Sequence, residues 1–190
     1  MEAGGKEERF NRLIVPHLDA VRNLAGWLTH DDADAADLAQ DTFLRAFRFF
    51  DQLRGDSVKP WLLKILRNTH YGRLKVAGRV VTGTSMDDAQ TEVALVTCSD
   101  GDAGLASDPE ASLLRAEDRD LIRRAMFDLS EDQRMILVLR EVEDFSYKDI
   151  AEILDVPLGT VMSRLGRARK MLRTRVSGMI REAGNGSRRS

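Results

Sequence analysis

Apolar residues recur every three to four positions along most of the chain, and this spacing is typical of amphipathic helices. The two-residue alternation that a half-buried strand requires is missing. Asp34 is a residue type that caps helices, and Pro16 breaks or restarts the first helix. The pattern predicts an all-α protein whose helices have these approximate bounds: 10–28, 34–50, 59–75, 111–128, 131–139, 147–154 and 158 to at least 172.

Short polar motifs mark the helix ends in the second half. Ser130 precedes Gln133 by three residues, which is the spacing of a capping box, and Ser146 precedes Asp149 in the same way. Pro157 should end the short helix before it, because the residue preceding a proline disfavours helical geometry. The helix over 111–128 is expected to turn one side inward, with Leu114, Leu121, Ile122, Ala125 and Leu129.

A polar segment separates the two helical halves. Residues 78–110 are rich in Gly, Ser, Thr and Asp and show no useful periodicity, which is typical of a flexible linker. Residues 76–110 carry seven acidic groups and one basic group. We therefore expect two small helical domains and two further segments, with the bounds 1–77 (first domain), 78–110 (acidic linker), 111–182 (second domain) and 183–190 (disordered tail).

The composition limits the class of protein. Hydrophobic residues make up 43% and charged residues 32%, and no apolar run approaches the ~18 residues of a membrane-spanning helix. The N-terminus lacks the pattern of a secretory signal, so we expect a cytoplasmic protein without membrane insertion. Cys98 and three scattered histidines do not form a zinc-ligand set. We expect no metal and no cofactor.

The last two helices have the pattern of a helix-turn-helix, in which a short helix and a tight turn precede a second helix. Residues 158–190 carry nine basic groups against Glu182 alone. Val161, Leu165 and Ala168 form an inward stripe, which continues to Leu172. The outward residues predicted to contact duplex DNA are Thr160, Ser163, Arg164, Arg167, Arg169, Lys170 and Arg173.

Within this set we assign different roles to different cations. Arginine pairs bidentately with guanine in the major groove, which favours Arg164 and Arg167 as base readers. Arg169, Lys170 and Arg173 are expected to contact phosphates. The competing interpretation is a solvated basic face, but such faces usually mix both signs of charge.

Two helices of the first half carry further candidate surfaces. The helix over 59–75 combines aromatic, basic and amide groups, a mixture that holds single-stranded nucleic acid, and Gly72 is a position at which it can stop early. Its candidate residues are Trp61, Lys64, Arg67, Asn68 and Tyr71, and the competing interpretation is an ordinary structural helix in which Trp61 belongs to the core. The helix over 34–50 has an outward face that suits a partner helix pair or is simply solvated. That face consists of Asp37, Gln40, Asp41, Leu44, Arg45 and Arg48.

These three stretches together resemble the extracytoplasmic-function sigma factors, the minimal two-domain class of bacterial transcription initiation factors. The resemblance rests on DAADLAQDTFLRAFRFF (34–50), RGDSVKPWLLKILRN (54–68) and the stretch 129–172. It implies that the first contacts core RNA polymerase, the second melts and reads the minus-ten element, with Asn68 capturing a flipped base, and the third reads the minus-thirty-five element. It also implies an anti-sigma factor and a role in a stress response.

Two other classes of function remain as alternatives. A stand-alone helix-turn-helix regulator should dimerise on a two-fold symmetric site, but the tail after Leu172 lacks a heptad seam. An enzyme is not expected, because the chain has no nucleophile paired with His and Asp and no phosphate-binding glycine loop. His30 with the neighbouring aspartates is better explained as a solvated turn than as a metal site. We expect no catalytic residue and no small-molecule substrate.

Overall fold

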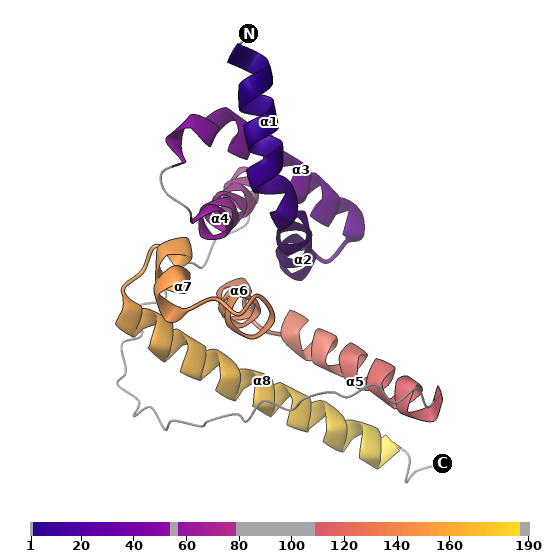
Figure 1. Ribbon diagram of the computed structural model, residues 1–190. Coiled ribbons are helices and arrows are strands. Elements are labelled where there is room, and N and C mark those ends of the chain that lie inside the picture. The colour runs from indigo at the N-terminus through magenta and orange to yellow at the C-terminus, as the bar shows by residue number, and fades with distance from the viewer. Residues whose placement is uncertain (1, 54–56, 79–108, 187–190) are drawn as a thin grey trace.

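The computed structural model describes residues 2–53, 57–78 and 109–186, and these residues form helices and no strands (Figure 1). The all-α expectation is confirmed. We call residues 2–78 the N-terminal half and residues 109–186 the C-terminal half. The helices are α1 (Glu2–Ile14), α2 (Leu18–Leu28), α3 (Asp32–Phe49), α4 (Val58–Val76), α5 (Pro109–Phe127), α6 (Glu131–Leu137), α7 (Tyr147–Leu154) and α8 (Leu158–Gly186).

Three shorter helical turns join these helices. The turn η1 (Val15–His17) separates α1 from α2 and contains Pro16, as the break predicted at that proline requires. The turn η2 (Phe50–Gln52) follows α3, and the wide turn η3 (Val138–Val142) extends α6. Because η1 interrupts it, the helix predicted over 10–28 is two helices, α1 and α2.

The N-terminal half is built on α2, α3 and α4. The N-cap of α3 is Asp31, whose Oδ1 accepts from the backbone N–H of Ala33 at 2.9 Å, so the expectation that Asp34 caps this helix is wrong. Asp34 instead lies in the first turn, where a carboxylate interacts favourably with the helix dipole. Gly72 does not end α4, which continues to Val76. A glycine in a helix costs only about 1 kcal/mol, which the packing of α4 outweighs.

The C-terminal half begins its helices where the capping motifs predicted. Ser130 Oγ accepts from Gln133 N–H at 3.4 Å and Gln133 reaches back to the Ser130 N–H, so the capping box is confirmed. Ser146 Oγ accepts from Asp149 N–H at 3.2 Å, but the Asp149 carboxylate accepts from the Ser146 hydroxyl rather than its backbone. α7 ends at Leu154, and Asp155 follows in the left-handed region with φ of 55°.

Two sequence expectations in this half are wrong. Ile122 is 47% exposed, whereas Ala125, Met126 and Leu129 are buried, so the inward face of α5 is rotated toward Met126. α8 runs to Gly186, so residues 183–186 continue the helix into the segment expected to be a disordered tail. The expected linker, residues 78–110, lies outside the described residues except for its two ends.

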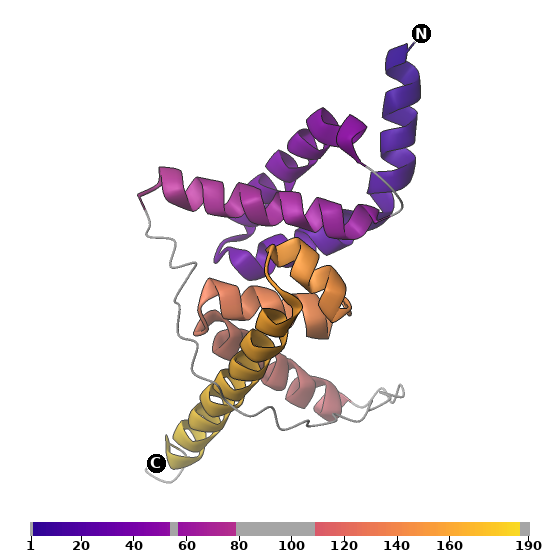
Figure 2. The same ribbon diagram turned by 90° about the vertical axis from the view of Figure 1, so that its left-hand side faces the viewer.

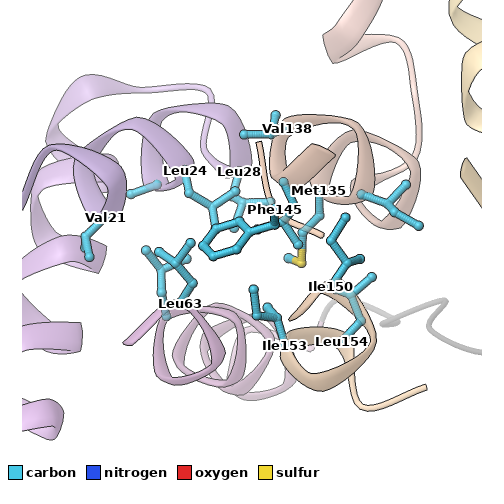
Figure 3. Packing of buried hydrophobic residues seen from close by; sticks show 14 of the residues in the cluster. Val21, Leu24, Leu28, Leu63, Met135, Val138, Phe145, Ile150, Ile153 and Leu154 are labelled. Carbon is cyan, nitrogen blue, oxygen red and sulfur yellow. The ribbon is translucent and has the colours of Figure 1, made fainter. Parts of the chain in front are cut away.

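The two halves pack against each other, which the sequence pattern did not predict. α4 lies on α7, and α2 lies on α6 (Figures 1 and 2). Buried apolar residues of both halves form one continuous cluster, in which Leu24 and Leu63 face Met135 and Phe145 (Figure 3). The burial of this apolar surface favours the packed arrangement.

Candidate nucleic-acid and partner interfaces

The predicted inward stripe of α8 is buried and fixes which way the helix faces. Val161, Leu165 and Ala168 are buried, and α8 contacts both α6 and α7 through this side. The predicted duplex-contacting residues Ser163, Arg167, Lys170 and Arg173 are exposed, and Thr160, Arg164 and Arg169 are half-buried. All seven therefore lie on one helix, and in Figure 1 this helix lies on the opposite side of α6 from the N-terminal half.

Arg169 is held by the protein itself. Its Nε and Nη2 donate to Glu141 Oε1 at 2.9 and 2.7 Å, and Glu141 belongs to η3. Burial lowers the pKa of Arg169, but hydrogen bonding and attraction by Glu141 more than offset this and raise it overall. This ion pair joins η3 to α8, so Arg169 orients the helix in addition to the phosphate contact expected of it.

The predicted strand-binding residues lie along α4. The Arg67 guanidinium lies over the ring of Tyr71 at 5.3 Å and donates to Asn68 Oδ1 at 3.4 Å. Asn68 is exposed, whereas Trp61 is half-buried and packs against the core. Lys64 lies 3.8 Å from the carboxylate of Asp155 in the turn before α8. The structure thus places Arg67, Asn68 and Tyr71 together.

Tyr71 joins α4 to the C-terminal half. Its hydroxyl donates to the carboxylate of Asp132 on α6. Burial raises the pKa of Tyr71, and the hydrogen bond to Asp132 raises it further. The phenol is therefore neutral and stays a donor in this arrangement.

Two further residues of α4 that the sequence analysis missed contact the C-terminal half. Lys59 Nζ lies 2.9 Å from Glu143 Oε2 and 4.7 Å from the centroid of the Phe145 ring. His70 Nε2 lies 3.2 Å from Glu131 Oε2. Burial lowers the pKa of His70, although Glu131 opposes the shift. Nothing in the local pattern of α4 distinguishes these positions from ordinary polar residues of an amphipathic helix.

Four carboxylates of the C-terminal half thus pair with α4. We call them the acidic row: Glu131, Asp132, Glu143 and Asp155. They come from the start of α6, the segment after η3 and the end of α7, so their order along the chain does not reveal that they share one surface. Asn23 on α2 also donates to Glu143, at 2.7 Å.

The outward face predicted on α3 is exposed apart from one ion pair. Leu44 is 53% exposed, and Asp37, Gln40, Arg45 and Arg48 are exposed. Asp41 is half-buried, because Arg73 of α4 donates to its Oδ2 through Nε at 3.1 Å. Arg73 also donates to the backbone carbonyl of Asp37 at 3.0 Å. This residue, which the sequence analysis missed, holds α3 and α4 together.

An apolar groove runs beside this face. It has a volume of about 820 Å³ and lies between α1, α2 and α3, with Phe10, Leu18, Phe43, Leu44 and Phe47 among its lining residues. Phe10 contacts Phe47 edge-on, with ring centroids 5.1 Å apart. The groove adds side chains of α1 to the candidate surface, none of which the sequence analysis proposed.

Over the described parts of the chain, no group of His, Cys, Asp and Glu side chains is arranged to hold a metal ion. The same residues include no helix that is both long and apolar enough to cross a membrane.

The chain matches two family models in the order of its two halves. Sigma-70 region 2 matches residues 13–80, and sigma-70 region 4 matches residues 119–172. The ECF RNA polymerase sigma-E factors of Salmonella typhimurium strain LT2 and of Escherichia coli strain K12 are each 35% identical over 178 residues, which is 93% of this chain and 91% of theirs. The RNA polymerase sigma-H factor of Pseudomonas aeruginosa is 33% identical over 182 residues, or 94% of this chain and 92% of that protein.

Two solved structures are similar to this chain over most of its length. The sigma factor RpoE of Bartonella quintana, solved in complex with the anti-sigma factor NepR, is 29% identical, with a TM-score of 0.66 over 90% of this chain and 98% of that one. CnrH, solved in complex with the cytosolic domain of CnrY, shares the fold at 22% identity, with a TM-score of 0.62 over 93% and 92% of the two chains. The resemblance seen in the sequence is confirmed, and the chain belongs to the extracytoplasmic-function (ECF) class of RNA polymerase sigma factors.

Proposed function

We propose that this sigma factor directs core RNA polymerase to its promoters through three surfaces, one on each of α3, α4 and α8. The observation that carries the assignment is the orientation of α8, whose buried stripe leaves an outward face of arginine, lysine and hydroxyl side chains. A helix presented in this way can enter the major groove of duplex DNA. The surfaces on α3 and α4 are assigned from their own exposed residues, as described below.

On α8, we assign the reading of the minus-thirty-five element to Arg164 and Arg167, with Thr160 and Ser163 as shorter contacts. Lys170 and Arg173 are exposed and contact phosphates, which positions the helix without reading sequence. The Arg169 side chain is oriented by its ion pair with Glu141, and we propose that it contacts the phosphates in this orientation. Its role is therefore partly to orient the helix.

On α4, we assign binding of the opened minus-ten strand to Trp61, Lys64, Arg67, Asn68 and Tyr71. Asn68 is exposed, and its amide can read the edge of an unstacked base. The adjacent Arg67 and Tyr71 supply a cation and a ring, which suit the backbone and the base faces of a single strand. Strand opening needs no hydrolysis by this chain, because binding energy offsets an unstacking cost of a few kcal/mol.

On α3, we assign the contact with core polymerase to Asp37, Gln40, Asp41, Leu44, Arg45 and Arg48. An exposed leucine beside an apolar groove, with charged residues around it, is typical of a surface that binds a partner helix. The groove lined by Phe10 and Phe47 extends this surface, and we include it in the contact.

We further propose that an anti-sigma factor regulates this chain by covering the surface on α3. The support is that the similar RpoE of Bartonella quintana was solved in complex with the anti-sigma factor NepR. We also predict that the protein is located in the cytoplasm, where core polymerase is found. A role in a stress response is a further prediction.

The decisive experiment adds the purified chain to core RNA polymerase on fragmented genomic DNA and maps the transcript starts. Initiation at a defined set of promoters that requires the chain supports the proposal. If the chain binds the same DNA without polymerase, as a dimer on two-fold symmetric sites, the stand-alone regulator is correct instead. Failure to bind core polymerase at all would contradict the role of α3.

A further inference from the structure

We propose that the C-terminal half holds this sigma factor in a closed state, in which the acidic row occupies the face of α4 that binds the minus-ten strand. The inference rests on the proposed function of α4. It adds an internal competitor: the carboxylates of Glu131, Asp132, Glu143 and Asp155 take the place of the strand's phosphates.

The contacts follow α4 along most of its length. Lys59 on the first turn pairs with Glu143 at 2.9 Å, and Lys64 lies 3.8 Å from Asp155. About two turns further on, Tyr71 donates to Asp132. His70, beside it, lies 3.2 Å from Glu131. The carboxylates therefore meet α4 from its first turn to Tyr71, five residues before its end.

The side chains of α4 supply hydrogen-bond donors, and the acidic row supplies acceptors. Lys59, Lys64 and Tyr71 present donors, and ionised carboxylates present only acceptors. The phosphates of a DNA strand are also negatively charged acceptors, so the strand and the acidic row compete for Lys64 and Tyr71, which belong to the proposed strand-binding set. Both cannot contact these residues at once.

Apolar packing lies next to the ion pair of Lys59 and Glu143, because Lys59 also contacts the Phe145 ring. Leu63 of α4 and Ile153 of α7 are fully buried, and with Phe145 they lie in the shared cluster (Figure 3). Within the row, the Glu143 side chain is only 8% exposed. An ion pair shielded in this way is screened less by salt than a surface pair.

The other two proposed surfaces stay accessible in the closed state. In Figure 1, α8 lies on the opposite side of α6 from α4, and its residues Ser163, Arg167 and Lys170 are exposed. On α3, Gln40 and Leu44 are exposed. Closure therefore blocks strand binding while leaving duplex contact and polymerase contact possible, and opening must precede promoter melting.

The test compares two variants of equal charge as free full-length chains. The row variant carries Glu131→Gln, Asp132→Asn, Glu143→Gln and Asp155→Asn. The control variant carries Glu8→Gln, Asp118→Asn, Asp128→Asn and Glu182→Gln, which are exposed positions outside the acidic row. Both gain four units of net charge, so any general attraction to DNA is matched.

The first readout is anisotropy of a fluorescein-labelled single-stranded DNA of random sequence. A chain that is mostly closed has an apparent affinity reduced by its open fraction, so we expect the row variant to bind about tenfold tighter than the control. Adding Asn68→Ala should remove part of this gain. Equal affinity of the row and control variants would overturn the proposal.

The second readout is the distance between the halves, from energy transfer between dyes at Arg12→Cys on α1 and Arg175→Cys on α8 in a Cys98→Ser background. We expect lower transfer in the row variant and unchanged transfer in the control. If the halves of the row variant separate but the variant binds the strand no more tightly than the control, the proposed competition is also rejected. If the row variant does not fold, the milder pair Asp132→Asn and Asp155→Asn gives the same comparison against Asp118→Asn and Asp128→Asn.

Initiation assays separate this inference from the proposed function. If the double substitution Lys64→Ala and Asn68→Ala leaves initiation by the polymerase complex unchanged, the proposed role of α4 in strand binding is rejected. If that variant loses initiation but the row variant gains no strand affinity, the role of α4 stands and only the closed-state proposal is rejected.

Discussion

The guanidinium of Arg134 on α6 donates a hydrogen bond of 2.9 Å to the backbone carbonyl oxygen of Trp27, in the last turn of α2. Arg134 is only 3% exposed, and it also donates to the carbonyl of Leu129 at 3.2 Å. Its guanidinium lies 4.6 Å from the ring centroid of Phe127. One cation therefore satisfies carbonyls from both halves, and a positive charge at the end of α2 interacts favourably with the helix dipole.

We expect Arg134→Met to destabilise the protein by about 2 to 3 kcal/mol, because it removes charge-assisted hydrogen bonds and leaves buried carbonyls without a donor. Methionine keeps most of the apolar volume, so the loss should come from the polar contacts. Urea unfolding measures the change. Arg124→Met on the exposed side of α5 is the control, and an equal loss in the two variants would contradict the role of Arg134.

The two serine caps should each contribute about 1 kcal/mol. Ser130→Ala removes the acceptor for the Gln133 N–H, and Ser146→Ala removes the acceptor for the Asp149 N–H. Thermal unfolding checks both. Ser177→Ala, at an exposed position inside α8, should leave the stability unchanged or raise it slightly, since alanine is the better helix former there.

Stability should depend on pH through His70. Burial lowers the pKa of His70 below 6.5, against the attraction of Glu131 and together with repulsion by Arg134 and Arg73. As the pH falls through about 6.5, the unfolded chain binds a proton that the folded chain does not, so the free energy of unfolding decreases.

The measurement is urea unfolding between about pH 7.5 and pH 5.5 in a His17→Gln background, because burial also lowers the pKa of His17. We expect His70→Gln to flatten the loss of stability toward acid pH. A slope that stays the same after this substitution would show that His70 is not its source.

The proposed polymerase contact predicts that Leu44→Asp weakens binding to core polymerase at least about tenfold without lowering stability, because Leu44 is exposed in the free chain. Competition against a labelled sigma factor measures the affinity. Val76→Asp is matched in chemistry and lies at a position that is 91% exposed at the end of α4. Equal weakening by both substitutions would argue against a specific contact on α3.

The assignment of α8 predicts different defects for two of its cations. Arg167→Ala should lose about 1 to 3 kcal/mol at one promoter position, whereas Lys170→Ala should weaken all sequences and lower the salt slope by about 0.9. Binding of promoter variants by the polymerase complex at several salt concentrations separates the two. Arg119→Ala, exposed on α5, is the control. Uniform loss on every promoter variant after Arg167→Ala would reject its base-reading role.

The sequence predicted those parts of the fold whose causes are local. The capping box at Ser130 and the bounds of α7 follow from residues within a few positions of each other, and the structure confirms them. The stripe formed by Val161, Leu165 and Ala168 is also a local periodicity, so the outward face of α8 could be identified from it. Asp34 was wrongly preferred as a cap because Asp31, three residues earlier, has the same chemistry.

The contacts between the halves could not be predicted in this way. His70 and Glu131 are 61 positions apart, and Arg134 and Trp27 are 107 positions apart. Neither pair leaves a periodic signal, because polar residues on an amphipathic helix are expected whether they face water or another domain. The acidic row and the groove beside α3 are therefore visible only once the helices are placed in space.

The shared cluster of Leu24, Leu63 and Ile153 has a consequence for how heat acts on this chain. Two units with separate interiors melt in two steps, but units that share an interior lose their order together. A single calorimetric peak is thus expected for the isolated chain, and it should split into two when a bound partner draws the halves apart.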